Sequence, residues 1–274
     1  MSHSTTIGGY LATRLAQAGV RDFFSVPGDF NLVLLDAFLK QPELRMIGCC
    51  NELNAGYAAD GYARSTGGLS AVVVTYMVGG LSVINAAAGA YSDDLPVLVV
   101  SGGPNTNDAP ANHLLHHTIA EHDFYQAVKC FEPVVASTFV VRHAADAPRM
   151  IDAAVSTCLA KRKPVYLEIA CNLASAKVPL PAMLSIPAPE LPVDSQALKA
   201  AVTAAAERIN SSTKPVLVAG VKIRSCQAAS AFLKLAEALG CAVAVMPDAK
   251  GLFQEDHPSF IGTYWGVVGS PNCS

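Results

Sequence analysis

The sequence predicts an α/β protein in which helices flank a parallel sheet and an incomplete second domain of the same class follows. Short apolar runs alternate with helical periodicity five times before residue 102, and runs without polar alternation are typical of strands buried on both faces. Hydrophobic residues make up 51% of the chain and charged residues 15%, which excludes disorder and allows a large core. At roughly 150 residues per domain, the length predicts one or two domains.

The first domain is predicted to alternate helix and strand from its beginning. Ile7, Leu11 and Leu15 lie on one helical face, and Gly19 follows as a stop signal. In chain order we expect a helix over 5–18, a strand over 23–26, a helix over 32–38, a strand over 44–50, a helix over 52–64, a strand over 69–75, a helix over 81–91, a strand over 96–101, a helix over 143–161 and a strand over 164–169. Glycine, proline, asparagine and histidine dominate residues 102–121, which predicts a long functional loop.

Five prolines between Val178 and Pro192 favour extended polyproline geometry, so this stretch predicts a linker. We place the first domain at 1–184, the linker at 185–195 and the second domain at 196–274.

The second domain is predicted to hold one βαβ unit. Its expected elements are a helix through Leu198, Val202 and Ile209, a strand over 216–219, a helix through Phe232, Leu235 and Leu239, and a strand over 242–246. Two parallel strands are too few for a sheet covered on both faces, and no element is predicted over 262–274. We therefore expect the chain to be the front part of a longer protein.

Charge and cysteine usage narrow the class of protein. Lys and Arg number 19 against 22 Asp and Glu, a formal net charge of -3, so nucleic acid is not an expected partner. Cysteines such as Cys49, Cys50 and Cys241 lie in apolar runs, and no leader precedes them, which indicates reduced core thiols in a cytoplasmic protein. Residues 67–92 carry no charge, but a glycine pair interrupts them, so we predict a buried strand and helix rather than a membrane span.

Two carboxylates follow predicted strands, at the sheet edge where ligands of open α/β sheets bind. Asp29 stands in a Pro-Gly turn, where it either caps the next helix or takes part in chemistry. Glu52 opens a helix of alanine and glycine after an apolar strand, which predicts a buried carboxylate with a raised pKa. A favourable interaction with the helix dipole is the other interpretation of Glu52.

Histidines cluster in the long loop, at His113, His116 and His117, with His122 beyond them. Their spacing allows a zinc site, solvated or capping histidines, or proton transfer near neutral pH. No cysteine lies near and no HExxH pattern occurs, so we assign no metal ligand to the chain. Neither G-x-G-x-x-G nor G-x-x-x-x-G-K-[ST] occurs, which argues against nicotinamide and ATP sites.

Several motifs occur in the order of one known family. They are Val26-Pro27-Gly28-Asp29-Phe30-Asn31-Leu32, Cys49-Cys50-Asn51-Glu52-Leu53-Asn54-Ala55, Val74-Thr75-Tyr76, Val78-Gly79-Gly80-Leu81-Ser82, Leu115-His116-His117-Thr118, Lys163-Pro164-Val165-Tyr166-Leu167-Glu168-Ile169 and Gly262-Thr263-Tyr264-Trp265-Gly266. Together they closely resemble pyruvate decarboxylases, the thiamine-diphosphate-dependent 2-keto acid decarboxylases of alcoholic fermentation. The resemblance implies a pyrimidine-binding domain followed by an incomplete Rossmann-like middle domain.

The resemblance implies decarboxylation of pyruvate, or a similar 2-keto acid, to acetaldehyde and carbon dioxide through a thiamine-diphosphate ylid and an enamine. This chain would supply the pyrimidine half of the site. Glu52 matches the glutamate that hydrogen-bonds the pyrimidine ring and activates the cofactor. Asp29, His116 and His117 match proton-relay and substrate-positioning groups.

Further pocket residues follow from the same resemblance. Pro27 and Val78 would line the pyrimidine pocket, and Thr75 the approach of the keto acid. Met77 departs from the family, which has Ser or Thr there, and this puts substrate preference in question. The family's Gly-Asp-Gly magnesium motif does not occur, so magnesium ligands are expected in a C-terminal domain outside this chain.

Because family sites form between subunits, we expect the full-length form to be a homo-oligomer, a dimer or a tetramer, and the isolated chain to be inactive. One alternative is another 2-keto acid decarboxylase or an acetolactate synthase-like enzyme, although the pair His116-His117 argues against the synthase. A second alternative is a truncated, non-catalytic paralogue that assembles with full-length subunits.

Overall fold

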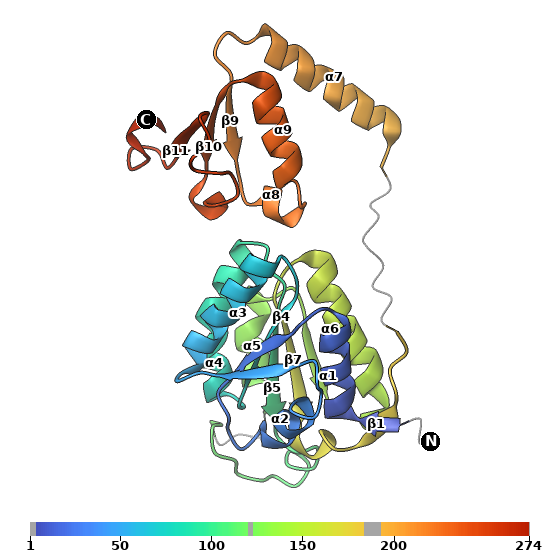
Figure 1. The fold of residues 1–274 in the computed structure, drawn as a ribbon. Coiled ribbons are helices and arrows are strands. Elements are labelled where there is room, and N and C mark those ends of the chain that lie inside the picture. The colour runs from blue at the N-terminus through green and yellow to red at the C-terminus, as the bar shows by residue number, and fades with distance from the viewer. Residues whose placement is uncertain (1–3, 120–122, 184–192, 274) are drawn as a thin grey trace. The chain divides into compact units, whose positions relative to one another are not determined.

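The structure, a computed structural model, describes residues 4–119, 123–183 and 193–273 (Figure 1). The chain divides into two compact units, residues 1–186 and 187–274, and each is described by itself. Residues 185–192 of the expected linker lie outside the described residues, and its last residue, Ser195, already belongs to a helix. The domain boundaries set from the sequence therefore stay predictions.

A six-stranded parallel sheet forms the centre of the first unit. Its strands are β2 (Asp22–Ser25), β3 (Arg45–Gly48), β4 (Ser70–Val74), β5 (Val97–Gly103), β6 (Thr138–Val141) and β7 (Val165–Ala170), in the spatial order β3-β2-β4-β5-β7-β6. The helices are α1 (Ile7–Gln17), α2 (Leu32–Phe38), α3 (Glu52–Thr66), α4 (Val78–Ser92), α5 (Gln126–Phe131) and α6 (Ala147–Lys161). The predicted parallel α/β class is confirmed.

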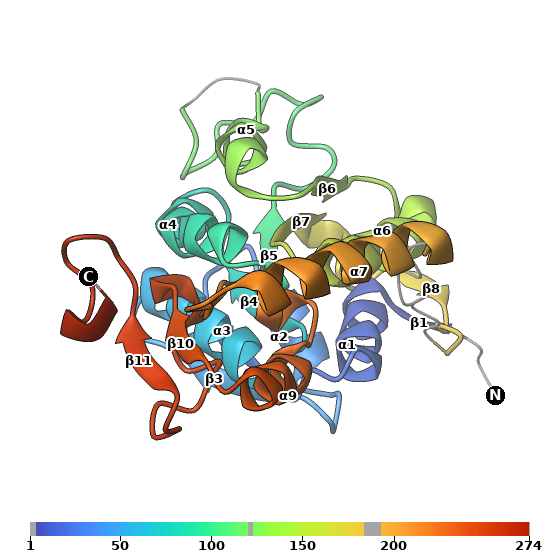
Figure 2. The same ribbon diagram turned by 90° about the horizontal axis from the view of Figure 1, so that it is seen from above.

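Two apolar clusters fill the two faces of this sheet. Figures 1 and 2 show the helices that surround the sheet. Helices α1, α2 and α6 pack on one face, and α3, α4 and α5 on the other. Within β4, Ala71 and Val73 point into the first cluster while Val72 and Val74 point into the second. Because alternate residues serve opposite faces and both faces are covered, every residue of the strand is apolar or buried.

The start of the chain differs from the prediction. Residues Ser4–Thr6 form a short strand, β1, which pairs antiparallel with β8 (Lys177–Pro179). Helix α1 therefore begins at Ile7 rather than residue 5, and the Thr6 hydroxyl caps it by accepting from the Gly9 amide at 3.0 Å. The first two residues assigned to the proline-rich stretch belong to β8.

The uncharged stretch over 67–92 forms β4 and α4, as predicted. Within the part of the chain that the structure describes, no helix is both long and apolar enough to span a membrane.

The prediction that the cysteines are core thiols is wrong for several of them. All eight thiols are free, but Cys50, Cys130 and Cys226 are exposed, because they lie in loops or on outward helix faces.

The second unit has a three-stranded parallel sheet in the order β11-β10-β9. Its elements are α7 (Ser195–Ser211), β9 (Val216–Ala219), α8 (Lys222–Ser225), α9 (Ala229–Leu239), β10 (Ala242–Val245) and β11 (Phe260–Thr263). Strand β11 corrects the expectation that residues from Gly262 onward add no element, because it extends the predicted two strands to three. No residue of α7 is buried in the described part of the chain, and Leu198 and Val202 of its predicted apolar face are exposed.

Candidate active site

The turn that carries Asp29 is braced by its neighbour Asn31. The buried Asn31 side chain accepts from the Gly28 amide at 2.9 Å and donates to the Val26 carbonyl at 3.2 Å. The Asp29 side chain accepts from the adjacent Phe30 amide at 3.0 Å rather than from an amide of the following helix, and it is 55% exposed. Helix α2 begins at Leu32 with Asn31 at its N-cap position. The interpretation of Asp29 as a helix cap is therefore wrong.

Two glycines allow this turn to approach the ends of β4 and β5. A Cβ atom on Gly102 would stand 1.7 Å from the Phe30 carbonyl oxygen, and one on Gly28 would stand 2.6 Å from Thr75 Cβ. Only glycine leaves room for such approaches. The Cys171 thiol also donates to the Phe30 carbonyl at 3.1 Å. Asp29 is thereby held against Thr75.

Asp29, His116 and His117 come together, although 87 residues separate the first two. His116 Nε2 lies 2.6 Å from Asp29 Oδ2, and the Thr75 hydroxyl donates to Asp29 Oδ1 at 3.5 Å. The two imidazole rings lie 4.5 Å apart between centroids, and Phe30 contacts both of them. The His116 side chain is 57% exposed, so the cluster is open to solvent.

The histidines lie in residues 104–119, which form no helix or strand, as predicted for this loop. Nearly buried Asp108 organises the loop by accepting from the Asn105 amide at 2.7 Å and pairing with His113 Nδ1 at 2.9 Å. His113 is thereby separated from the other two histidines, and His122 lies outside the described residues. The His117 backbone has a φ of 63°, and its Nδ1 atom is buried without a hydrogen-bond partner.

Glu52 is the first residue of α3, and Asn51 caps that helix by accepting from the Leu53 amide at 2.8 Å. The predicted burial of Glu52 is wrong, because its place at the tip of the helix leaves the side chain partly exposed. A Cβ atom on Gly79 would stand 3.3 Å from Glu52 Oε1 and 2.9 Å from Thr75 Cγ2. Gly79 therefore lies beside both Glu52 and Thr75.

The connection from β4 to α4 makes a sharp turn at Met77. Its φ of 55° and ψ of -87° lie in a region that residues with a side chain seldom adopt. The Met77 side chain packs partly against the apolar cluster shared by α3 and α4. Val78, next in the chain, is 45% exposed, and Pro27 is exposed as well. Both residues thus offer apolar surface at the strand ends.

Sequence reasoning did not assign a function to Glu168, which lies in the middle of β7 and is fully buried. It pairs with Arg142 Nη2 at 2.7 Å and accepts from the Tyr166 hydroxyl at 2.9 Å. Burial raises the pKa of Glu168 to about 7, while Arg142 and Tyr166 oppose that rise. Arg142 also donates to the Pro104 carbonyl at 2.8 Å, where the histidine loop begins. The sequence did contain a signal for this residue, because Glu168 stands inside an apolar strand. A charge buried in such a strand needs a partner of opposite charge or a hydrogen bond.

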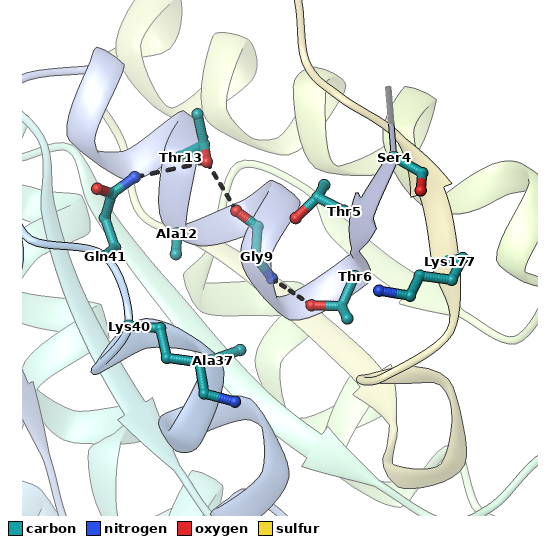
Figure 3. A pocket seen from close by; sticks show the side chains of 10 residues that line it. All are labelled: Ser4, Thr5, Thr6, Gly9, Ala12, Thr13, Ala37, Lys40, Gln41 and Lys177. Atoms are coloured by element: carbon teal, nitrogen blue, oxygen red, sulfur yellow. Dashed lines mark hydrogen bonds between the residues drawn. The ribbon is translucent and has the colours of Figure 1, made fainter. Parts of the chain in front are cut away.

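Two pockets of the first unit are candidates for a binding site. One, of about 400 Å³, opens between α1, the end of α2 and the β1–β8 pair (Figure 3), and Lys40 and Lys177 are among its lining residues. The other, of about 440 Å³, is lined by loop residues such as Asn105 and by Arg142. None of the seven predicted site residues lines either pocket. The predicted site residues therefore lie outside these pockets, after the carboxyl ends of β2, β3, β4 and β5.

Comparison with known proteins gives this cluster a family context. Residues 5–127 match the family described as thiamine pyrophosphate enzyme, N-terminal TPP binding domain. Residues 202–274 match the family described as thiamine pyrophosphate enzyme, central domain. The first match contains all seven predicted site residues.

Three curated relatives carry related names. Pyruvate decarboxylase 4 of Arabidopsis thaliana is 54% identical over 272 residues, which cover 98% of this chain and 45% of that protein. Pyruvate decarboxylase 1 of Pisum sativum and pyruvate decarboxylase 2 of Oryza sativa subsp. japonica are each 53% identical with the same coverage. The chain spans about half the length of the curated relatives it matches. It belongs to the thiamine pyrophosphate enzyme family, in which it resembles pyruvate decarboxylases from end to end.

Proposed function

We propose that this chain supplies the pyrimidine half of a thiamine-diphosphate-dependent active site that decarboxylates pyruvate, or a similar 2-keto acid, to acetaldehyde and carbon dioxide. The observation that carries the proposal is the contact of 2.6 Å between His116 Nε2 and Asp29 Oδ2, to which Thr75 also donates. Gly79 lies beside both Thr75 and Glu52. The names of the relatives that match almost the whole chain support the choice of substrate.

The residues around Glu52 fit the aminopyrimidine ring of the cofactor. Gly79 has no side chain to cover Glu52 Oε1, so a ring hydrogen can reach that carboxylate. The exposed side chains of Val78 and Pro27 offer apolar surface for the rest of the ring. A hydrogen-bond acceptor beside apolar surface is the usual composition of a cofactor pocket. Bound thiamine diphosphate supplies the electron sink that decarboxylation of a 2-keto acid requires.

The chain's own residues bind the pyrimidine ring, transfer the proton and position the substrate. Glu52 accepts a hydrogen bond from the pyrimidine and fixes its orientation. His116 Nε2 holds a proton shared with Asp29 Oδ2, which makes the pair a general acid for the carbon that has lost carbon dioxide. Thr75 orients Asp29 by donating to Oδ1. In the tautomer with its proton on Nδ1, His117 can donate from this unpartnered atom to an oxygen atom of the keto acid.

We propose that the diphosphate and its magnesium ion are bound by a domain of another subunit, as the resemblance to pyruvate decarboxylases implies. Exposed aromatic and apolar side chains on α3 and α4, namely those of Tyr57, Val78 and Tyr91, support a subunit interface there and hence a homo-oligomer. The eight free thiols support a reducing compartment, which we propose is the cytoplasm.

A chimera tests the proposal. These 274 residues replace the matching portion of the Arabidopsis pyruvate decarboxylase 4, and acetaldehyde formation from pyruvate and from other 2-keto acids is measured. We expect turnover with pyruvate, and a loss of about 10²- to 10⁴-fold on Glu52→Gln, the range for a positioned proton-transfer group. Glu207→Gln, an exposed glutamate of α7, is the matched control.

Undiminished turnover in the Glu52→Gln chimera would remove Glu52 from the site. The isolated 274-residue chain is expected to form no acetaldehyde, and turnover by that chain would overturn the proposal that it holds half of a site.

A further inference from the structure

We propose that Asp29, His116 and His117 form a binding site for a divalent transition-metal ion, Zn²⁺ above all, and that the bound ion blocks proton transfer. Metal binding is inferred from the geometry of the cluster alone, whereas its inhibitory consequence rests on the proposed function. This site differs in position and in ligand chemistry from the oxygen-rich site expected for magnesium.

The three side chains have the separation that a metal site requires. One ring nitrogen of each histidine and one carboxylate oxygen of Asp29 all lie within 4.8 Å of one another. Zinc binds nitrogen and carboxylate oxygen at about 2.0 to 2.2 Å, which places tetrahedral ligands about 3.3 Å apart. The 2.6 Å pair of His116 and Asp29 would open by about 0.7 Å, and the wider pairs would close by at most about 1.5 Å. Side chains that are 55% and 57% exposed can make such movements.

His117 provides a second, independent observation. Its Nδ1 atom is buried and has no hydrogen-bond partner, which is a costly state for a polar atom. Phe30 contacts the rings of both His116 and His117, so the two imidazoles are held side by side. In the tautomer with its proton on Nε2, the Nδ1 atom of His117 has a lone pair that can bind a metal ion.

The charges around the cluster attract a cation. Burial raises the pKa of the Cys171 thiol to about 11, and the nearby negative charges of Asp29 and Asp108 add to that rise. Cys171 contacts the Phe30 carbonyl, beside the cluster, so the same negative potential acts where the metal would bind. Two imidazoles and one carboxylate are ligands that favour zinc over magnesium.

Zinc would take three protein ligands and a water molecule, an open coordination. Bonds form from zinc to His116 Nε2 and to Asp29 Oδ2, and the proton that these two atoms share leaves to the solvent. The pair then has no proton to give, because the shared proton has left and zinc occupies the lone pair of His116 Nε2. If the proposed function holds, an enzyme with zinc bound at this cluster cannot carry out the proton transfer and so cannot complete turnover.

The binding test uses the 274-residue chain with zinc chloride alone at pH 7.5, after the exposed thiols have been alkylated. Isothermal titration in two buffers of different ionisation enthalpy measures affinity and proton release. We expect one site with proton release in the wild type, and an affinity at least about 10-fold lower in His116→Gln and in Asp29→Asn. His113→Gln is the matched control, because that histidine lies in the same loop but pairs with Asp108.

Cobalt(II) can replace zinc, and its absorption spectrum reports which atoms bind the metal. We expect the spectrum of a site with nitrogen and oxygen ligands, without the charge-transfer bands of a thiolate ligand. A 100-fold excess of magnesium should not displace zinc. Equal zinc affinity in the wild type and His116→Gln, or an equal loss in His113→Gln, would overturn the site. Thermal unfolding of each variant verifies that it is folded.

The consequence for activity is tested in the chimera, with magnesium in excess. We expect zinc to abolish turnover at the concentration that fills the site, and a chelator followed by magnesium to restore it. Zinc binding in a chimera that has no turnover would contradict only the proposed function. Full turnover in zinc-saturated chimera would contradict the inhibitory part of this inference.

Discussion

At the scale of single residues, both candidate carboxylates have an asparagine neighbour that performs the structural task. Asn31 braces the turn around Asp29, and Asn51 caps the helix that Glu52 opens. Neither carboxylate is needed to satisfy a helix terminus, and Asp29 instead pairs with His116. Side-chain preferences alone assign Asp to capping, and only the hydrogen bonds reveal which neighbour fills that position.

Removal of the acid–base pair should affect catalysis rather than folding. In the active chimera, Asp29→Asn or His116→Gln is expected to lower kcat by about 10²- to 10⁴-fold while the variants stay folded, because both side chains are half exposed. Steady-state kinetics and thermal unfolding measure the two effects. His143→Gln, an exposed histidine outside the cluster, should retain activity. A kcat near that of the parent chimera in either variant would contradict the proposed proton transfer.

At the scale of elements, α3 and α4 approach so closely that a single glycine decides their separation. A Cβ atom on Gly56 would stand 2.7 Å from Ala86 Cβ, and neither atom can rotate away because each is attached to a helix backbone. The predicted small-residue face of α3 is therefore the face that packs, with Ala55 and Ala59 fully buried beside it.

Two substitutions on the same helix test this packing. Gly56→Ala should lower the free energy of unfolding by about 1 to 3 kcal/mol through overpacking. A Cβ atom on Gly61 would meet open space, so Gly61→Ala should raise the free energy of unfolding by about 0.4 to 1 kcal/mol. Urea denaturation measures both. Equal effects of the two substitutions would show that the close contact does not determine stability.

At the scale of the whole first unit, the buried carboxyl group of Glu168 makes the stability of the fold depend on pH. Glu168 has a pKa raised to about 7 by burial, against an ordinary value of 4.5. Since the folded pKa is the higher one, folding favours the protonated form. The stability that this group contributes is full below about pH 4.5 and is lost as the pH rises through about 7.

Replacement of this carboxyl should remove that pH dependence. The free energy of unfolding of the wild type, relative to Glu168→Gln, is expected to fall by about 3 kcal/mol between pH 4.5 and pH 8. Urea denaturation across this range measures the difference, and Glu207→Gln serves as an exposed control. A difference that stays constant over the range would contradict the raised pKa.

Elements with strong patterns were predictable from the sequence, and several short elements were not. Strands β4 and β5 have both faces covered, so they appear as unbroken apolar runs. Strand β6 lies at the sheet edge, and three of its four residues are only partly buried, so its pattern is weak. Helix α5 has six residues, too few to show a period, and β11 has four with a glycine among them.

The sequence by itself determined the α/β class, the alternation of the first unit and the position of every candidate residue at a strand end or in the long loop. Apolar periodicity and glycine placement are local properties, and they can be recognised without contacts. Tertiary structure alone decided that Asp29 contacts His116, that His113 turns to Asp108 instead, and that Glu168 meets Arg142. These pairs depend on which loops the parallel strands bring to one edge, and hydrogen bonds between distant segments leave no periodic signal in the chain.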